Sequence, residues 1–599
     1  MRRLIAAMLL VGVLGTEAMA EKKTAALAAK AAQTNVADRT GNISKRHRED
    51  LLRKIMEIRE FFNRSDDKNA VRLRQFADLL AREVRGKKYG LVFEEHRERA
   101  DVELESNLPI LKENAKRFID HGGEMNFLIE GENLAALKLL EKTHRNRIDF
   151  IYIDPPYNTG NKDFIYNDSY VDAKDTFRHS KWLSFMEKRL KIARTLLTER
   201  GIVFISIDDN ELATLRLLCD DIFGDNFVAT LPTIMNLKGN QDQFAFAGTH
   251  EYTVVYAKNK TKAVFNHFTI DEEEATDEWR QDEYGYYKVG ANLKSTGVNA
   301  PRSKRPNLFF PLFVTEDNRC LVERESKSDI EIYPRTDGED MSWRWSKEKF
   351  VKEAHNIIVN RSDNGKVSVY KKQRPAVGDL PTKKPKSLFY KAEYSSGNGT
   401  ALLKEMFGTK VFSNPKPLQL IEDFVVIGSQ KNSTVLDFFA GSGTTGHAVM
   451  RLNAQDGGRR RFILVTDNEN GICENVTYER LKRAIKNEGL KARLKYMKID
   501  YLPITEKLYY EYADDLLKNV RELVELENAV DFAHDASVAI VQSDAEYAAF
   551  LADEKRLAAC RVLYVGHHVL RSAASEATLS ARNVELREIP QYYYPELED

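Results

Sequence analysis

The run DFIYIDPPYNTG, residues 149–160, constrains this chain more than any other stretch. Its first half is apolar and predicts a buried strand of a parallel sheet. Two prolines then end the strand, because proline fixes its own φ and has no N–H for a ladder. The result is a stiff turn, Asp154-Pro155-Pro156-Tyr157, at the carboxyl end of a strand, where open α/β sheets bind ligands. This turn offers a carboxylate and peptide carbonyls without partners, which can accept hydrogen bonds from an exocyclic amino group. It also offers an aromatic ring, which can stack on the base that carries the amino group.

A second strand and turn follow far downstream, in STVLDFFAGSGTTGHAVM at residues 433–450. Residues 434–439 predict another buried strand, and Gly441, Gly443 and Gly446 predict a tight turn that a ligand approaches closely. Free N–H groups at the start of the next helix favour a negative group such as a carboxylate. The turn also matches G-x-G-x-x-G, so a dinucleotide site is the alternative, although a lone match is weak.

Together the two motifs resemble those of the amino-methylating DNA methyltransferases, which use S-adenosylmethionine. DPPY resembles their catalytic motif and DFFAGSGTTG their cofactor motif, in the order of the permuted group with the catalytic half first. The chain looks most like the modification subunit of type III restriction systems, over roughly residues 50 to 599. Further stretches that fit are FLIEGENLAALKLL (127–140), WLSFMEKRLKIARTLLTERGIVFISIDDNE (182–211), THEYTVVYAKN (249–259), RPNLFFP (305–311) and FSNPKP (412–417).

The resemblance implies an α/β fold with a doubly wound, mostly parallel sheet of the S-adenosylmethionine-dependent methyltransferase type. Strands alternating with helices between residues 125 and 260 predict a parallel sheet independently. The expected parts are a signal-like or disordered lead-in (1–45), a helical N-terminal region (46–120), the catalytic half (121–260), a target-recognition insert (261–400), the cofactor-binding half (401–500) and a small, acidic α/β association domain (501–599).

Four local elements are predicted from apolar periodicity. Helices are expected at 47–62, 70–85 and 182–197, and a buried strand at 201–207. Asp208 and Asp209 follow that strand, and we interpret them as a turn and helix cap rather than as a catalytic pair.

The insert is identified by its composition. Residues 284–307 carry five basic side chains and no acid, and residues 371–391 carry seven basic side chains against Asp379. Interleaved aromatics, including Trp343 and Trp345, suit phosphate contacts and base stacking. By themselves such segments are typical of solvated basic loops. Between two halves of a methyltransferase they favour a target-recognition domain.

The resemblance assigns the catalytic role to Asp154, Pro155, Pro156 and Tyr157. The Asp154 carboxylate would accept one N–H of the adenine amino group and the Pro155 carbonyl the other, which frees the nitrogen lone pair for attack on a sulfonium methyl group. Tyr157 would stack on a base flipped out of the duplex.

The cofactor side follows from the same resemblance. The expected cofactor-binding residues are Asp437, Phe439, Ala440, Gly441, Ser442, Gly443 and Thr444, with Glu132 and Lys416 as further positions. The second strand of the nucleotide fold, in RFILVTDNEN (461–470), should end in an acid that binds the ribose hydroxyls, and Asp467 and Glu469 are both candidates. No cluster of His, Cys and Asp predicts a metal site.

The implied activity is site-specific methylation of adenine N6 in duplex DNA within a type III restriction-modification system. Asp before Pro-Pro-Tyr is typical of adenine enzymes in this family, and Ser of those acting on the cytosine amino group. The alternatives are a cytosine-amino (N4) or RNA-directed methyltransferase, and a non-catalytic nucleic-acid-binding module. A binding module would be expected to lose Asp154 or the glycines, and this chain has both.

The distribution of charge along the chain indicates where its partners would bind. Residues 501–599 hold 9 basic and 19 acidic side chains, so the neutral chain carries its positive charge in the first 500 residues, where DNA is expected. The resemblance implies a homodimer and a restriction subunit as partners, with the acidic tail as the association surface; a domain that only caps the sheet is the alternative. Within the tail, residues 508–527 predict a helix, SVAIVQSD and RVLYVG predict short strands, and IPQYYYPELED ends the chain with exposed-looking aromatics.

The amino end conflicts with this picture. Residues 1–20 have the pattern of a secretory signal. A DNA-modifying enzyme needs a cytoplasmic cofactor, so we interpret them as a start-site extension or lead-in and expect a cytoplasmic protein without a membrane span. Scattered cysteines at 219, 320, 473 and 560 fit reduced, buried thiols.

Overall fold

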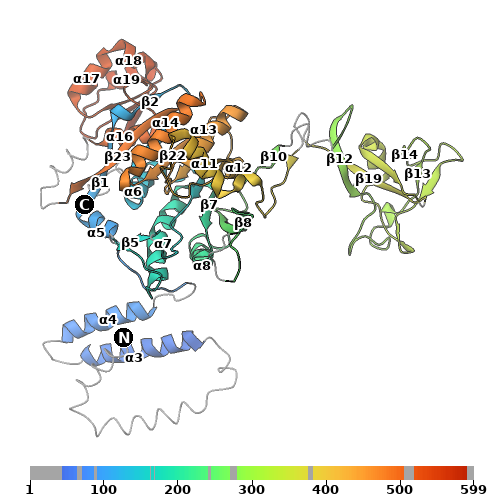
Figure 1. Cartoon of the computed structure of the whole chain (residues 1–599), viewed down its shortest axis with the longest axis horizontal. Coiled ribbons are helices and arrows are strands. Elements are labelled where there is room, and N and C mark those ends of the chain that lie inside the picture. The colour runs from blue at the N-terminus through green and yellow to red at the C-terminus, as the bar shows by residue number, and fades with distance from the viewer. Residues whose placement is uncertain are drawn as a thin grey trace, which may run out of the picture. The chain divides into compact units, whose positions relative to one another are not determined.

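The computed structural model describes residues 43–63, 70–85, 91–161, 163–166, 169–239, 245–269, 279–363, 365–375, 382–504 and 519–589. The chain forms two compact units, residues 1–92 and 93–599 (Figure 1). In the first, helices α3 (Ile43–Asn63) and α4 (Ala70–Arg85) pack together, and α4 buries small side chains such as Ala77 and Ala81. Both helices were predicted from the sequence and are confirmed. The signal-like residues 1–20 lie outside the described residues.

The second unit is built on one large sheet with the strand order β1-β23-β3-β22-β21-β4-β7-β9-β8 (Figure 1). The bounds are β1 (Asn107–Glu113), β2 (Ile119–Asp120, paired with β23), β3 (Met125–Glu130), β4 (Ile148–Ile153), β7 (Leu197–Ile207), β8 (Phe227–Ile234), β9 (His250–Ala257), β21 (Thr434–Asp437), β22 (Arg461–Thr466) and β23 (Arg493–Pro503). The strands from β23 to β7 are parallel, whereas β1 and β9 run antiparallel to their neighbours. The predicted mostly parallel α/β sheet is confirmed.

Helices cover the sheet in two layers. One layer holds α6 (Asn133–His144), α7 (Arg178–Leu196) and α8 (Leu212–Phe223), and the other holds α11 (Ser396–Phe407), α12 (Leu418–Gly428), α13 (Thr444–Asp456) and α14 (Tyr478–Asn487). The chain winds from β3 through α6 towards β4, but from β21 through α13 towards β22, in the opposite direction along the sheet. Because such crossovers are right-handed, opposite directions put the helices on opposite faces. The fold is therefore doubly wound, as predicted.

The winding reverses between β4 and β21, which are neighbours in the sheet. Phe150 of β4 lies beside Val435 of β21 in the parallel ladder. Behind them, the rings of Phe150 and Phe204 lie 5.2 Å apart, and Phe204 is 5.2 Å from Phe424 of α12. This core fixes the two strands that end in the DPPY and glycine-rich motifs.

The insert between β9 and α11 has its own small core. Its sheets are β11 (Arg280–Asp282), β12 (Gly285–Asn292), β19 (Val367–Gln373) and β18 (Ile357–Arg361); β14 (Cys320–Leu321), β13 (Leu312–Val314) and β15 (Ile330–Ile332); and β16 (Arg335–Thr336) with β17 (Glu339–Asp340), beside α10 (Lys347–Lys352). The ribbon of β10 (Phe268–Thr269) and β20 (Thr382–Lys383) precedes and follows it. Trp343 is 2% exposed and donates its indole N–H to the Phe310 carbonyl at 2.9 Å.

The expectation that Trp343 stacks on a base is therefore wrong. Short strands supply little apolar surface, so the insert fills its core with the largest ring available. Trp345 packs against Phe350 of the same core, with ring centroids 5.5 Å apart.

Beyond the sheet edge, helix α16 (Val520–Asn528) contacts α6 and β1. A small parallel sheet follows, of β24 (Val538–Val541), β25 (Val562–Val565) and β26 (Glu585–Glu588), covered by α17 (Asp544–Ala552), α18 (Glu554–Ala559) and α19 (Ala573–Ala581). The two strands predicted in this tail are confirmed. Most of the helix predicted from residue 508 and the end from residue 590 lie outside the described residues.

A short hairpin and a short helix remain to be placed, followed by the cysteines and the question of a membrane span. The hairpin of β5 (Ile165–Tyr166) and β6 (Ser169–Tyr170) follows the DPPY turn, and α5 (Arg99–Ser106) precedes β1. The four cysteines are free and buried, as predicted. Among the described helices, none combines the length and apolar character that crossing a bilayer requires.

A buried lysine ties α16 to the main sheet. Lys495 of β23 is 0% exposed, and its Nζ lies 3.0 Å from Glu113, 2.8 Å from Glu525 and 2.6 Å from Asp531. Three carboxylates this close together have the geometry of a cation site. The lysine ammonium already occupies their centre, so the cluster acts as an internal ionic tie.

We expect Lys495→Met to lower the free energy of unfolding by on the order of 3 kcal/mol, because it leaves buried carboxylates without their cation. Urea unfolding followed by tryptophan fluorescence measures the change. Lys112→Met is the matched control: Lys112 pairs with Asp500 across the same two strands, β1 and β23, but both side chains are about half exposed, so a change within about 0.5 kcal/mol is expected. Equal effects of the two substitutions would contradict the buried tie.

Candidate active site at the carboxyl edge of the sheet

Four neighbouring parallel strands bring the predicted residues to one edge of the sheet. In the order β3, β22, β21 and β4, their carboxyl ends lead to Glu132, to Asp467 and Glu469, to residues 438–444, and to residues 154–157. Glu130 of β3 lies beside Thr466 of β22, and Asp437 of β21 beside Leu464 of β22. Because carboxyl ends of parallel strands share one edge, the two motifs meet at the point where the winding reverses.

The DPPY turn is anchored through its second proline. The indole N–H of Trp182, on α7, donates to the Pro156 carbonyl at 2.7 Å. The expectation that the carbonyls of this turn lack partners is therefore wrong for Pro156, because a buried carbonyl needs a donor. The Pro155 carbonyl accepts no hydrogen bond from the described residues. One acceptor of the turn is thus used for anchoring and the other is open.

A buried glutamate holds the end of the turn. Asn158 has a positive φ of 57° and donates its side-chain amide to Glu211 at 2.6 Å. Glu211 also lies 2.7 Å from His179 and accepts from Thr214. Burial raises the pKa of Glu211, while Thr214, Asn158 and His179 oppose the shift.

Next to Glu211, Asp208 accepts from the backbone N–H of Asn210 at 2.9 Å. The predicted turn before α8 is therefore confirmed. The predicted helix cap is wrong, because the residue at the N-cap position of α8 is Glu211 and not either aspartate. Glu211, which supports the motif, was not singled out from the sequence.

Asp154 is the centre of a compact polar cluster. Its Oδ1 accepts from the Tyr157 hydroxyl at 2.9 Å and lies 3.3 Å from Lys416 Nζ. Its Oδ2 has no donor in the part of the chain that the structure describes. Lys416 Nζ also lies 2.6 Å from the Tyr157 oxygen and 2.6 Å from Glu251 Oε1. Glu251 is the second residue of β9, an antiparallel strand whose amino end reaches this edge.

Lys416 was predicted on the cofactor side, and it bridges the two halves. Its ammonium faces Asp154, while its carbonyl accepts from the Thr444 hydroxyl of the glycine-rich turn at 3.4 Å. Burial opposes the charge on Lys416, but Asp154 and Glu251 outweigh it and raise the pKa of the ammonium. Burial also raises the pKa of Glu251, with Lys416 acting in the opposite direction.

Tyr157 remains a phenol in this cluster. Burial, together with the charges of Asp154 and Glu251, raises the pKa of the Tyr157 hydroxyl well above its usual value. It therefore has one hydrogen to donate, and Asp154 at 2.9 Å is nearer than Glu251 at 3.2 Å. Lys416 Nζ lies 4.9 Å from the centre of the tyrosine ring.

The glycine-rich turn has the backbone shape that its sequence predicts. Gly441 and Gly443 have φ values of 47° and 77°, in the left-handed region that favours glycine. A Cβ on Gly443 would lie 3.0 Å from the Thr477 methyl group. Asp437 lies beneath the turn, where it accepts from the Phe439 N–H at 3.0 Å and the Thr445 hydroxyl at 2.6 Å. Burial raises the pKa of Asp437 to about 7.

A buried arginine braces the same turn. Arg480 of α14 donates from Nη1 to the Ser442 hydroxyl at 3.0 Å and to the Thr444 hydroxyl at 2.7 Å. Its Nη2 is buried without a partner among the described residues, and burial lowers the pKa of Arg480 to about 9. Strand and turn patterns did not single this residue out, because it lies in a helix with ordinary amphipathic spacing.

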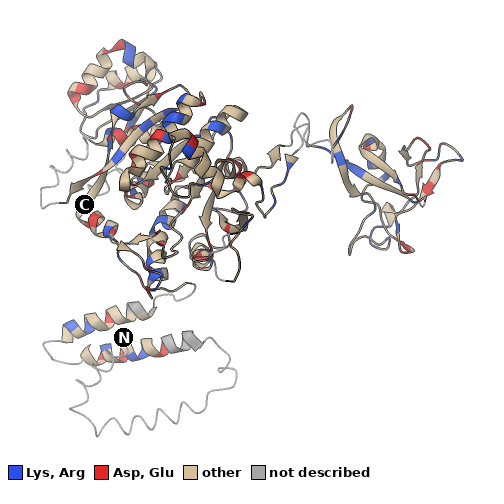
Figure 2. Ribbon diagram, in the orientation of Figure 1, with Lys and Arg blue, Asp and Glu red and all other residues tan. Residues whose placement is uncertain are grey.

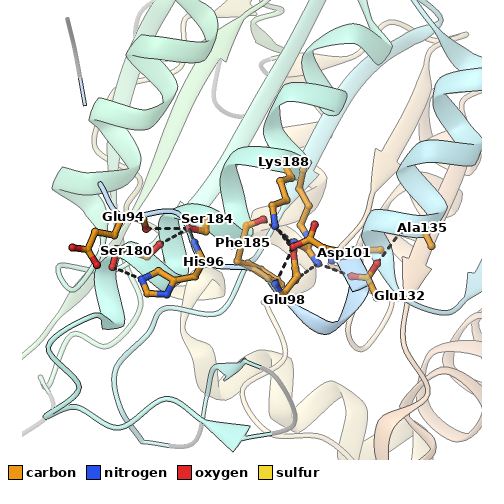
Figure 3. Close-up of polar contacts among 12 residues, drawn as sticks. Glu94, His96, Glu98, Asp101, Glu132, Ala135, Ser180, Ser184, Phe185 and Lys188 are labelled. Carbon is orange, nitrogen blue, oxygen red and sulfur yellow. Dashed lines mark hydrogen bonds and ion pairs between the residues drawn. The ribbon is translucent and has the colours of Figure 1, made fainter. Parts of the chain in front are cut away.

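Glu132 is held by a second buried arginine, Arg189. Figure 3 labels Glu132 together with Ala135 and Glu98 of this network. Glu132 Oε2 accepts from the Ala135 N–H at 2.9 Å, and its Oε1 from Arg189 at 2.5 Å. Arg189, 1% exposed, also donates to both oxygens of Glu98, at 2.8 and 3.0 Å. Its remaining N–H groups reach Asn133 and the Phe185 carbonyl. All five guanidinium hydrogens are thereby used.

Asn133 connects this network to the glycine-rich turn by donating to the Phe438 carbonyl at 3.0 Å. The ring of Phe439 lies 5.9 Å from that of Phe185, beside Arg189. Of the two predicted ribose acids, Asp467 accepts from the Glu469 N–H at 3.1 Å, and both side chains are exposed. The contacts do not separate these two candidates.

Comparison with known proteins identifies the family of this chain. A DNA methylase family model matches residues 148–479, which contain both motifs and the insert. The chain is 48% identical over 379 residues to the EcoPI Mod subunit, a type III restriction-modification enzyme of Escherichia phage P1, and the match covers 58% of each chain. It is 33% identical over 371 residues to the type II methyltransferase M.KpnI of Klebsiella pneumoniae, covering 61% of this chain and 86% of that one.

The match thus spans little more than half the length of the EcoPI Mod subunit. Among solved structures, the cytosine-N4-specific PvuII DNA methyltransferase is 10% identical, with a TM-score of 0.32 over 63% of this chain and 96% of that chain. The family model covers more than half of the 599 residues and both of the motifs that meet at the sheet edge. The chain belongs to the DNA methylase family.

Proposed function

We propose that the protein is a site-specific DNA methyltransferase that transfers a methyl group from S-adenosylmethionine to the N6 amino group of adenine in duplex DNA. The observation that carries the proposal is the pair of open acceptors at the DPPY turn. Asp154 Oδ2 and the Pro155 carbonyl both lack donors among the described residues. They belong to adjacent residues, and an exocyclic amino group has two hydrogens to donate.

The glycine-rich turn fits the cofactor. The N–H groups of Gly441 and Ser442 have no acceptor within the described chain, so they are available to a carboxylate such as that of the methionine part. We propose that residues 439–444 hold this part, that Glu132 lies beside it, and that Asp467 or Glu469 binds the ribose hydroxyls. S-adenosylmethionine, when bound, supplies a methyl group already activated by a positively charged sulfur.

The residues at the DPPY turn would then activate the amine. Acceptors on both N–H bonds draw the nitrogen towards tetrahedral geometry and free its lone pair, and they stabilise the positive charge that develops on it. Tyr157, tied to Asp154 by its hydroxyl, would present its ring to a base flipped out of the duplex and offset part of the lost stacking. Holding the nitrogen in line with the methyl group supplies the remaining rate enhancement.

Adenine is proposed because Asp154 is the first residue of the tetrapeptide, as in the adenine enzymes that the chain resembles. An enzyme that methylates cytosine N4 would use the same two acceptors to bind an exocyclic amino group, so the base must be identified by experiment. Similarity to the EcoPI Mod subunit, whose name gives it as part of a type III restriction-modification enzyme, supports the proposal that this chain also serves such a system.

Basic surface in and around the insert supports a DNA substrate. Lys and Arg, blue in Figure 2, lie along strands of the insert and the ribbon beside it. A groove of about 730 Å³ lies at that ribbon and is lined by Lys383, Lys384 and Lys386. Other basic residues hold the insert together: Lys372 and Arg374 both pair with Asp282 at 2.6 Å. We propose that the insert reads the DNA sequence and that the groove contacts phosphates.

The proposed partners are a second copy of the chain and a restriction subunit, in the cytoplasm where DNA and cofactor are found. The small α/β domain at 538–589 is the proposed association surface. A deletion that tests it should begin after Asp531 and not at residue 505, because Glu525 and Asp531 belong to the buried cluster around Lys495.

Asp154→Ala is expected to reduce methyl transfer by on the order of a hundredfold or more, since it removes one of the two acceptors at the reacting nitrogen. Transfer of labelled methyl groups to duplex DNA measures the rate, and calorimetry with S-adenosylmethionine checks that the cofactor still binds. Asp209→Ala, which removes an exposed acid after the neighbouring strand β7, should leave the rate unchanged. A retained rate in Asp154→Ala would exclude the proposed role.

Gly443→Val is expected to weaken S-adenosylmethionine binding, because valine resists a φ of 77° and its Cβ would crowd Thr477. Calorimetry measures the dissociation constant. Gly457→Val is the matched control: Gly457 ends the same helix with a φ of 67°, but open space surrounds it, so cofactor affinity should not change. Unchanged affinity in Gly443→Val together with binding of NAD would support a dinucleotide site instead.

A further inference from the structure

The buried ammonium of Lys416 stands where it should hinder the proposed reaction. It lies 3.3 Å from Asp154 Oδ1, at a site where the target nitrogen gains positive charge as it attacks. An ammonium so close repels that charge and draws on the same carboxylate. The lysine side chain is only 10% exposed, so water screens it little. A site built for an amine therefore needs something that offsets this cation.

Glu251 has the contacts for that task. Among the described residues, Lys416 Nζ donates hydrogen bonds to the Tyr157 oxygen and to Glu251 Oε1, and it forms an ion pair with Asp154 Oδ1. Glu251 is nearer to the ammonium, at 2.6 Å, than Asp154 is, at 3.3 Å. Its side chain is 13% exposed and comes from β9, outside both sequence motifs. With Glu251 ionised, two carboxylates face one ammonium, and the three side chains of Asp154, Lys416 and Glu251 together carry a net negative charge.

We propose that Glu251 is a positioning residue that takes up the charge of Lys416 and so keeps Asp154 available to the target amine. The inference rests on the proposed methyltransferase function and deepens it. Lys416 contributes by holding Asp154 Oδ1, together with the Tyr157 hydroxyl, so that Oδ2 is the oxygen left for the substrate. Its carbonyl, bonded to Thr444, couples this arrangement to the glycine-rich turn. Glu251 contributes by preventing the same lysine from neutralising the site.

The proposal makes a prediction about charge that a purely structural role does not. Replacing Glu251 by Gln keeps the shape of the side chain but leaves Lys416 with Asp154 as its sole anionic partner in the cluster. The set of Asp154, Lys416 and residue 251 is then neutral. Replacing Lys416 by Met as well removes the cation and makes the set negative again. The second substitution should therefore repair the first, although it removes one more native contact.

Single-turnover methyl transfer by the full-length protein tests this with Glu251→Gln, Lys416→Met and the double variant. Glu251→Gln should lower the rate constant by at least about tenfold, while the dissociation constants for S-adenosylmethionine and duplex DNA change by less than about threefold. The rate constant of the double variant should be several-fold higher than that of Glu251→Gln. Lys416→Met alone should be faster than Glu251→Gln, because it removes the cation from the cluster, whereas Glu251→Gln leaves the cation in place. Glu251→Asp should retain most of the activity.

A double variant no faster than Glu251→Gln would overturn the proposal, as would a wild-type rate in Glu251→Gln. If the single Gln variant does not fold, a double variant that is as slow as Asp154→Ala has the same consequence. These outcomes differ from failure of the proposed function, which would appear as activity in Asp154→Ala. An inactive Asp154→Ala with a fully active Glu251→Gln would refute the role of Glu251 alone.

Discussion

The parallel pairing of β4 with β21 is the contact on which the rest of the site depends. It brings together two strands that are separated in the chain by the whole insert, and each strand ends in a motif that turns sharply at the same edge. Winding in opposite directions from this pair leaves the edge uncovered by a crossover, which is where doubly wound sheets bind ligands. The acceptors at Asp154 and Pro155 and the turn from Gly441 to Gly443 are thereby neighbours, as transfer of a group between two substrates requires.

Buried cations hold the surroundings of the site. Arg189 gives all five hydrogens to acceptors that include Glu98 and Glu132, and the ammonium groups of Lys495 and Lys416 each lie within 3.3 Å of three oxygen atoms. Removing one partner from such a cluster costs more than the cluster contributes, because the remaining charges stay out of water. The arrangement therefore fixes geometry more than it adds stability. Arg480 is an exception among them, with Nη2 unpartnered among the described residues, and it lies directly against the glycine-rich turn.

Much of the fold followed from local patterns in the sequence. The strands ending at Ile153 and Asp437 are apolar runs stopped by prolines or glycines, and α4 and α7 follow apolar periodicity. These elements could be predicted because the interactions that form them lie within a few residues of each other in the sequence. The contacts between segments were beyond such patterns. Nothing in THEYTVVYAKN marks Glu251 as the partner of Lys416, because that pair depends on an antiparallel strand reaching the same edge. Trp343 was misjudged for a related reason: aromatics among basic residues look alike whether they fill a core or face a ligand.

Identification of the modified base tests the central claim most directly. Duplex DNA incubated with the purified protein and S-adenosylmethionine can be digested to nucleosides and analysed by mass spectrometry, with a parallel sample sequenced for modified positions. The account predicts N6-methyladenine as the sole new nucleoside, at one recurring sequence. N4-methylcytosine in its place would contradict the assignment of adenine, and DNA that stays unmodified while the cofactor binds would contradict the claim that the two motifs form one methyl-transfer site.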